Sequence, residues 1–213
     1  HKLKATHEAV QLLARDVEPA EFKSEYTDYR AVLHVHSHLS HDSRGTVEEI
    51  RQAAREAGVR VVMFTEHPAD HYDFVDDGHR GLEEGVLFVP GAEQRGLLSY
   101  PTASVKDQPI DGPQAMADVV VQNNGLAFLS HLEERMDWNI DSLTGNEIYN
   151  IHADFKDEVR MIRMLRNPLA LLQMSPAVRD YPQEWFATLL DYPADYLKRW
   201  DELCQKTPHT GIA

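Results

Sequence analysis

The sequence predicts an α/β fold with a parallel sheet, either open or closed into a barrel. Three observations lead to this expectation: short apolar runs rich in β-branched residues, segments with helical spacing between them, and regular alternation of the two. A chain of 213 residues has room for one domain, or at most two, with a sizeable core. We expect a single domain over residues 1–213, with residues 1–25 as a helical N-terminal extension.

The first strand–helix–strand unit follows this extension. Residues 31–36 form a short apolar run that contains two histidines and is typical of a strand. Thr46 and Glu49 have the spacing of a capping box at the start of a helix. Residues 59–64 form the next apolar run, and the helix between the two runs predicts that the strands are parallel.

The alternation continues to the C-terminus. Later apolar runs predict three more strands, at residues 86–89, 126–129 and 147–149. Helical spacing predicts helices or pairs of helices at residues 114–124, 156–172 and 182–205. Glu18 and Pro19 should interrupt the N-terminal helix, because a residue before proline disfavours helical geometry.

Composition limits the function classes. The formal net charge is −14, which argues against binding a long nucleic acid. The single cysteine, Cys204, excludes an internal disulfide framework. No apolar stretch is long enough to span a bilayer, so we expect no membrane partner and a cytoplasmic protein. Because residue 1 is His rather than Met, a removed leader stays an open alternative.

The strongest chemical signal is the pair His34 and His36. Residues i and i+2 of a strand point to the same face, so two imidazoles at a strand end form half of a metal site. The alternative is a pair of hydrogen-bonded histidines on a half-buried strand. Later strands favour the metal interpretation, because each is followed by a further His, Asp or Glu. The residues that follow the five strands are Asp42, His67, Glu93, His131 and His152. The carboxyl ends of parallel strands meet at one face, so we expect one shared site there.

These motifs together resemble the PHP (polymerase and histidinol phosphatase) family. The segment from His34 to Asp42 is similar to the first motif of the family, and Thr65-Glu66-His67 to the second, in which Asp usually stands in place of Glu66. Gly91-Ala92-Glu93 and Ser130-His131 resemble the third and fourth motifs, and residues 147–152 the fifth. The resemblance implies a distorted (β/α)7 barrel and a metal-dependent hydrolase.

The resemblance also implies a ligand set for two or three divalent ions. His34, His36 and Glu93 would bind one ion. Glu93 would bridge to a second ion, which His131 and His152 also bind, and Asp42 with His67 would bind a third. Nitrogen and oxygen donors without a thiolate suit zinc, manganese or iron. We expect Glu93 and Asp42 to take part in catalysis, and Arg95 to bind a substrate phosphate.

The family pattern ends with an Asp-x-His motif on the last strand, which is absent before Ala213. We therefore expect that the last strand begins near Gly211 and that the natural chain continues past Ala213. The leading hypothesis is a phosphoesterase that acts on a small phosphomonoester through metal-activated water. The alternatives are an amidohydrolase-like metal hydrolase, or a PHP-like domain that binds a metal or ligand without catalysis.

Overall fold

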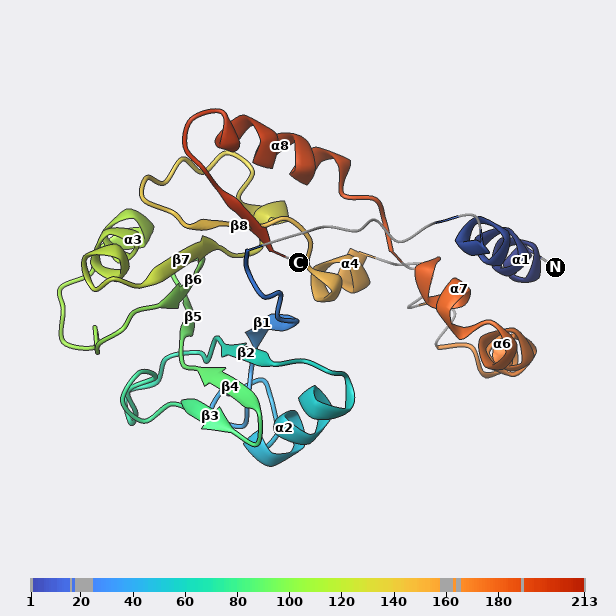
Figure 1. Cartoon of the computed structure of the whole chain (residues 1–213), viewed down its shortest axis with the longest axis horizontal. Helices are drawn as coiled ribbons and strands as arrows, with labels where there is room; N and C mark the ends of the chain where they lie inside the picture. Colours follow the sequence, from blue (N-terminus) through green and yellow to red (C-terminus); the bar gives the residue numbers. More distant parts are fainter. Residues whose placement is uncertain are drawn as a thin grey trace. The chain divides into compact units, whose positions relative to one another are not determined.

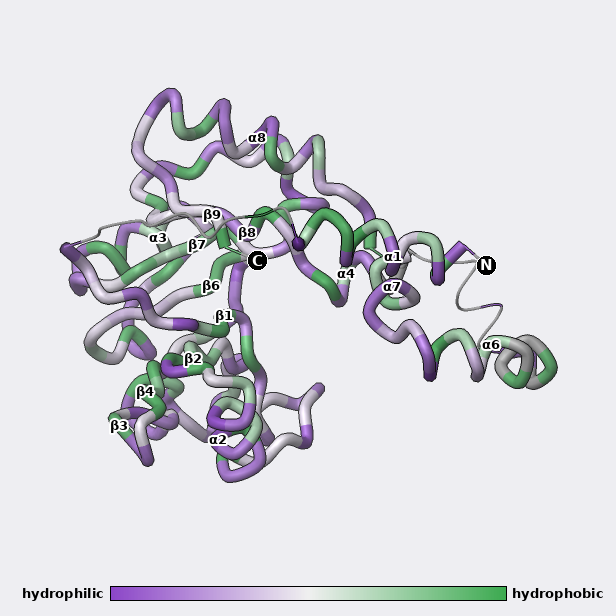
Figure 2. The backbone as a smooth tube through the Cα atoms, turned by 45° about the vertical axis from the view of Figure 1, so that its right-hand side comes forward, coloured by the Kyte–Doolittle hydropathy of each residue, from purple (hydrophilic) through white to green (hydrophobic). Residues whose placement is uncertain are grey.

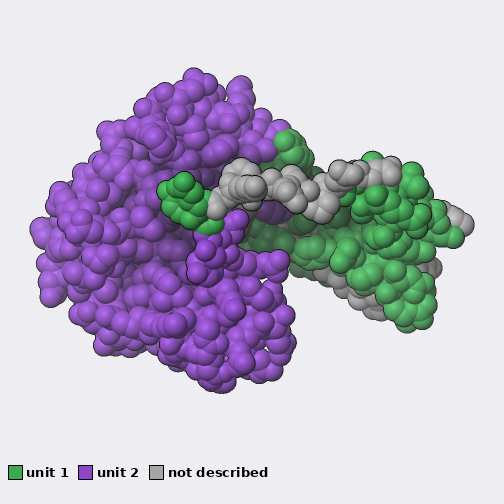
Figure 3. All heavy atoms as spheres, viewed as in Figure 1, with its two compact units in different colours: residues 1–26, 150–193 green, residues 27–149, 194–213 purple. Residues whose placement is uncertain are grey.

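The computed structural model describes residues 2–15, 17, 25–157, 163, 166–188 and 190–212. The chain forms two compact units, each drawn in its own colour in Figure 3. Unit 1 consists of His1–Tyr26 and Asn150–Pro193, and unit 2 of Thr27–Tyr149 and Ala194–Ala213. Our expectation of a single domain over residues 1–213 stays a prediction.

Unit 2 contains two mixed sheets, whose arrangement can be followed in Figure 1. The first has the order β1-β2-β4-β3, and its strands are β1 (Ala31–Val35), β2 (Val61–Phe64), β3 (Gly81–Glu83) and β4 (Val86–Val89). The second has the order β5-β6-β7-β8-β9, and its strands are β5 (Ala92–Gln94), β6 (Leu97–Tyr100), β7 (Leu126–Leu129), β8 (Gly145–Glu147) and β9 (Thr210–Ile212). The strands β1, β2 and β4 are parallel, as are β7, β8 and β9.

The helices of unit 2 are α2 (Val47–Glu56), α3 (Gly112–Gln122) and α8 (Ala194–Cys204), with a 3-10 turn η1 (Leu132–Glu134) after β7. The capping box expected at the start of α2 is confirmed: Thr46 accepts a hydrogen bond from the backbone N of Glu49, whose side chain bonds back to the backbone of Thr46. The helix α3 packs against β6 and β7. Figure 2 shows β6 and β7 as hydrophobic and α2 as largely hydrophilic, which fits a buried sheet and an exposed helix surface.

A backbone bridge and a shared core connect the two sheets. Glu66, just beyond β2, pairs in parallel with Ala92 of β5. One buried cluster combines Leu98, Tyr100 and Phe128 of the second sheet with residues of the first. The partly buried residues packed against it come from β1, β2, β4 and β9: Leu33, Met63, Val89 and Ile212. Among the described strands, β1 and β3 are the edge strands of the first sheet and β5 and β9 those of the second, so they form no closed barrel.

The expectation of a parallel sheet is correct for six strands and wrong for β3, β5 and β6, because β3 runs antiparallel to β4. The strands β5 and β6 form a tight hairpin at Arg95 and Gly96, both with positive φ (53° and 76°), and β6 also runs antiparallel to β7. The strands β3 (Gly-Leu-Glu) and β5 (Ala-Glu-Gln) contain no apolar run, which explains why β3 and this hairpin were not predicted. The strand expected at residues 147–149 instead ends at Glu147. The strand expected near Gly211 is present as β9.

Unit 1 is helical in its described part. It contains α1 (Lys2–Arg15), α4 (Ile151–Asp157), α6 (Pro168–Asp180) and α7 (Pro182–Ala187). His7 of α1 and Glu184 of α7 are 2.7 Å apart, which joins the two ends of this unit. The expected interruption at Glu18 and Pro19 lies outside the described residues, as does much of the helix expected from residue 156. None of the described helices is long and apolar enough to cross a bilayer.

Candidate metal centre

The first two histidines reach the site because β1 contains a bulge. Between two paired positions, β1 advances from Val32 to Val35 while β2 advances only from Val62 to Phe64. One extra residue on β1 therefore disrupts the ladder, and His34 takes a positive φ of 61° there. A bulge of this kind redirects a side chain next to a functional site.

Glu93 lies at the centre of a group of imidazoles. Its Oε2 atom is 3.1 Å from His34 Nε2, 3.4 Å from His36 Nε2 and 3.7 Å from His67 Nε2. Its other oxygen, Oε1, is 3.2 Å from His131 Nε2. The two carboxylate oxygens thus face different histidines, as a carboxylate that bridges two metal ions would.

Asp42 extends this group toward solvent. Its Oδ2 atom is 3.3 Å from His67 Nε2, and its Oδ1 atom is 3.5 Å from His36 Nδ1. The side chain of Asp42 is 47% exposed, whereas that of Glu93 is 14% exposed. A ligand group at Asp42 and His67 would therefore lie at the open side of the site.

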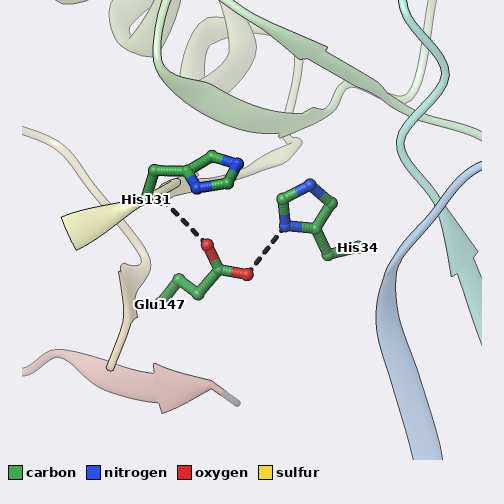
Figure 4. Close-up of side chains that lie close together, drawn as sticks. All are labelled: His34, His131 and Glu147. Carbon is green, nitrogen blue, oxygen red and sulfur yellow. Dashed lines mark hydrogen bonds and ion pairs between the residues drawn. The ribbon is translucent and has the colours of Figure 1, made fainter. Parts of the chain in front are cut away.

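Two further carboxylates contact the Nδ1 atoms of His34 and His131, the ring nitrogens that do not face Glu93. Figure 4 shows Glu147 between His34 and His131: Glu147 Oε1 is 2.7 Å from His34 Nδ1, and Oε2 accepts a hydrogen bond from the His131 backbone N at 2.8 Å. Glu133 Oε1 is 2.8 Å from His131 Nδ1. A carboxylate accepts hydrogen bonds, so it favours the ring form with hydrogen on Nδ1 and directs the Nε2 lone pair to the other side. Both Nε2 atoms face Glu93.

The hydrogen bonds shift several pKa values. Burial alone opposes the charged form of His34, but the hydrogen bonds with Glu147 and Glu93 raise its pKa to about 9. The hydrogen bonds with Glu133 and Glu93 raise the pKa of His131 to about 10. Burial would raise the pKa of Glu93, yet its hydrogen bonds with the histidines hold this pKa far below the usual range. Protons on the imidazoles thus balance the carboxylate charge in the metal-free site.

The spacing of the donor atoms fits a metal ion. Two ligands at about 2.05 Å from one tetrahedral ion lie roughly 3.3 Å apart, and neighbouring ligands at about 2.1 Å from an octahedral ion lie roughly 3.0 Å apart. The distances from Glu93 to the four Nε2 atoms, 3.1 to 3.7 Å, are close to these values. Among the described residues, four groups of donors have a spacing that could hold an ion: His34, His36 and Glu93; His36, Asp42 and His67; His34, His131 and Glu147; and His131, Glu133 and Glu134. Their nitrogen and oxygen donors suit a divalent zinc, manganese or iron ion.

Six of the seven predicted ligands lie in unit 2 and are brought together there: His34, His36, Asp42, His67, Glu93 and His131. The seventh, His152, is on α4 of unit 1, and its role as a ligand stays a prediction. Arg95 is exposed at the tip of the β5–β6 hairpin, where it lines a pocket of about 250 Å³ together with Lys106, Gln94 and Gln108. Its contact with a substrate likewise stays a prediction.

Three carboxylates that support the candidate ligands were not predicted from the sequence: Glu147, Glu133 and Glu66. Glu147 lies inside a predicted strand, and Glu133 follows His131 by two residues. Glu66 differs in the sequence from the Asp that usually stands in the second motif, but its contacts cannot be predicted from that difference. An acidic residue near each metal-type histidine is the signal that could have found them, because such histidines usually donate their second N–H to a carboxylate or carbonyl.

The chain matches the family model of the PHP domain over residues 33–177, which is more than half of its length. The matched region begins one residue before His34 and extends beyond His131. A search of curated proteins found no match.

Proposed function

The chain belongs to the PHP domain family, and from this premise we propose that it is a metal-dependent phosphoesterase that acts on a small phosphomonoester. The family is generally one of metal-dependent hydrolases, and the described residues include groups suited to bind metal ions. The finer fold that we propose is the distorted (β/α)7 barrel of the family. The core cluster shared by strands of both sheets supports it, because such a core is what the inside of a small barrel contains.

One observation carries the proposed function: four imidazole Nε2 atoms surround the single carboxylate of Glu93. His34, His36 and Glu93 would bind one ion, and Glu93 with His131 and His152 a second. Asp42 and His67 would bind a third. When bound, divalent ions lower the pKa of a nearby water and neutralise phosphoryl oxygens.

The chain's own residues would set the orientation of these groups. Glu147 and Glu133 hold the Nδ1 sides of His34 and His131, so that both rings present Nε2 to Glu93. Asp42 is the most exposed carboxylate of the site, so it is the one best placed to meet a substrate. We propose that Arg95, beyond the end of β5, binds a substrate phosphate through its guanidinium group.

The small substrate is supported by electrostatics. A net charge of −14 disfavours a long polyanion, because binding along many phosphates requires many basic side chains. A single phosphomonoester needs only local positive charge, which metal ions and Arg95 would supply.

The test is to prepare the protein without metal, add back Mn²⁺, Zn²⁺ or Fe²⁺, and measure bound metal and phosphate release from a panel of phosphomonoesters. We expect metal-dependent phosphate release, and we expect Glu93→Gln to lose both metal content and turnover. Glu56→Gln is the matched control, because Glu56 is exposed on α2, where it accepts a hydrogen bond from the side chain of Gln52. Metal binding without hydrolysis of any substrate would favour the non-catalytic binding domain, and normal metal content in Glu93→Gln would contradict its role as a ligand.

A further inference from the structure

Glu66 occupies an unusual position for a carboxylate. Its side chain is almost fully buried, with 1% of the residue exposed. Both of its oxygens accept hydrogen bonds from the backbone N of Ser37 at 3.1 Å, and Oε2 also accepts one from the Ser40 hydroxyl at 2.6 Å. These donors lie in the loop after β1, so the Glu66 side chain attaches this loop to the end of β2.

The Glu66 backbone attaches a third segment. Its N–H donates to the carbonyl of Gly91 at 3.0 Å, and its carbonyl accepts from the backbone N of Glu93 at 3.2 Å. Glu66 therefore fixes the main chain of the central carboxylate. One residue thus links the loop that follows β1, the end of β2 and the start of β5.

Ser40 continues this network to two candidate ligands. Its hydroxyl oxygen accepts a hydrogen bond from the backbone N of His67 at 2.9 Å and lies 3.2 Å from His36 Nδ1. A hydroxyl has one hydrogen and two lone pairs, and here the hydrogen goes to Glu66. Toward His36, Ser40 can then act only as an acceptor. Ser40 therefore favours the neutral His36 ring with hydrogen on Nδ1, whose Nε2 lone pair is free for a metal ion next to Glu93.

We propose that Glu66 and Ser40 are positioning residues that fix the Nδ1–H form of His36 and the main chain of His67 for metal binding. Glu66 would do for His36, through the Ser40 hydroxyl, what Glu147 does for His34 and Glu133 for His131 by direct contact. The proposal deepens the proposed function and rests on it. It gives this chain a reason to keep a carboxylate before His67.

Asp42 is the competing partner for the same nitrogen. Its Oδ1 atom is 3.5 Å from His36 Nδ1, against 3.2 Å for the Ser40 oxygen. The longer distance is beyond the usual hydrogen-bond range of about 2.7–3.2 Å, and Asp42 is half exposed while Ser40 is buried. A buried hydroxyl is the stronger constraint on the ring, because water does not compete for it.

The first experiment is ¹⁵N NMR of the histidine rings in the metal-free full chain, at a pH where His36 is neutral. We expect the wild-type ring to carry hydrogen on Nδ1 and a free lone pair on Nε2. In Ser40→Ala we expect a mixture of the two forms and a metal affinity for Mn²⁺ or Zn²⁺ lowered about 10–100-fold. Ser40→Thr keeps the hydroxyl and should restore the Nδ1–H form.

Two variants complete the design. Glu66→Gln should disturb the His36 ring in the same way, because an amide nitrogen at Oε2 would face the Ser40 hydroxyl with a donor. Ser43→Ala is the matched control: Ser43 lies in the same loop and donates to the His36 carbonyl, but does not contact its ring in the described contacts. We expect it to keep the wild-type ring form and affinity.

The outcomes separate this proposal from the proposed function. A wild-type His36 ring with hydrogen on Nε2 overturns the positioning role, even if Ser40→Ala fails to fold. So does a change of the ring in Asp42→Asn together with none in Ser40→Ala. If the ring forms behave as expected but the wild type binds no metal, the positioning network exists and the proposed function fails.

Discussion

Replacing Glu147 with Gln changes a buried side chain that contacts two candidate ligands. Glu147 Oε1 lies 2.7 Å from His34 Nδ1, and Oε2 accepts from the His131 backbone N at 2.8 Å. A carboxylate accepts both hydrogen bonds, whereas an amide offers one acceptor and one donor group. In the variant, one of the two N–H groups faces an NH₂ group. Where this group faces His34, the ring can relieve the conflict by giving up the hydrogen on Nδ1 and keeping the one on Nε2, the nitrogen that faces Glu93 and would bind the ion.

The expected loss follows from the hydrogen bond that is removed. A buried hydrogen bond to a charged group contributes about 1.5–3 kcal/mol, and each 1.4 kcal/mol corresponds to a tenfold change in binding. We therefore expect the metal affinity to fall by about 10–100-fold. Replacing a residue that binds the ion directly would lower the metal affinity more than this. A loss far above 100-fold would therefore indicate that Glu147 itself binds the ion, which its position in a group with His34 and His131 also allows.

The pH dependence of stability provides a second measure of the same contact. Burial lowers the pKa of His34, but the hydrogen bonds with Glu147 and Glu93 together outweigh burial and raise this pKa from 6.5 to about 9. Protonated His34 therefore stabilises the metal-free fold fully below about pH 6.5, and this stabilisation is lost as pH rises through about 9. The shift corresponds to roughly 3 kcal/mol. In Glu147→Gln this decline in unfolding free energy between pH 6.5 and 9 should shrink.

Metal affinity is measured by competition with a chelator, and stability by urea unfolding at several pH values. Glu56→Gln, on the exposed surface of α2, makes the same chemical change and should leave both quantities unaltered. An affinity for Glu147→Gln within about twofold of wild type would refute the reasoning, because the contact between Glu147 and His34 would then contribute less than about 0.5 kcal/mol to metal binding.

Three further predictions concern the fold and the site. Thr46→Ala removes the cap of α2 and should lower the unfolding free energy by about 1 kcal/mol in urea; an unchanged midpoint would show that the capping box contributes nothing. In Gly145→Ala the new Cβ would lie 1.9 Å from the Thr210 carbonyl oxygen, so β9 must shift and stability should fall by roughly 1–3 kcal/mol; wild-type stability would contradict the β8–β9 pairing. Because His34 and His131 have pKa values of about 9 and 10, metal binding to both at pH 7.5 should release about two protons, seen in calorimetry as a heat that depends on the buffer; a heat independent of the buffer would contradict this.

The ends of the strands were the most predictable part of the site. A polar residue directly after an apolar run lies where a buried strand meets solvent, so sequence spacing alone placed His67 and His131 near His34. The supporting groups were not predictable in this way. Which nitrogen of a ring faces a carboxylate depends on side-chain rotamers, and these cannot be predicted from the periodicity of the sequence. Glu147 is an example, because as a strand residue it looks no different from any other glutamate.

His34 and His36 lie close together as predicted, but the local structure that brings them together differs from the predicted one. Regular alternation along a strand was the argument for placing His34 and His36 on one face. Instead, His34 lies in a bulge, and His36 follows the last residue of β1. Both rings still reach Glu93. A bulge depends on the register with β2, which is a property of two strands and is therefore not visible in the sequence of one.

Glu147 bonds to two residues whose backbone is strained, His34 and His131. His34 and His131 have φ values of 61° and 49°, a left-handed conformation that costs an ordinary residue about 1–2 kcal/mol. Glu147 bonds to the ring of the first and to the backbone of the second, so its two hydrogen bonds offset this strain. The imidazoles are therefore held in place by the fold before an ion arrives. It follows that metal binding should exchange protons for ions with little movement of the main chain, and that backbone NMR shifts around β1 and β7 should change little between the metal-free and the metal-loaded protein.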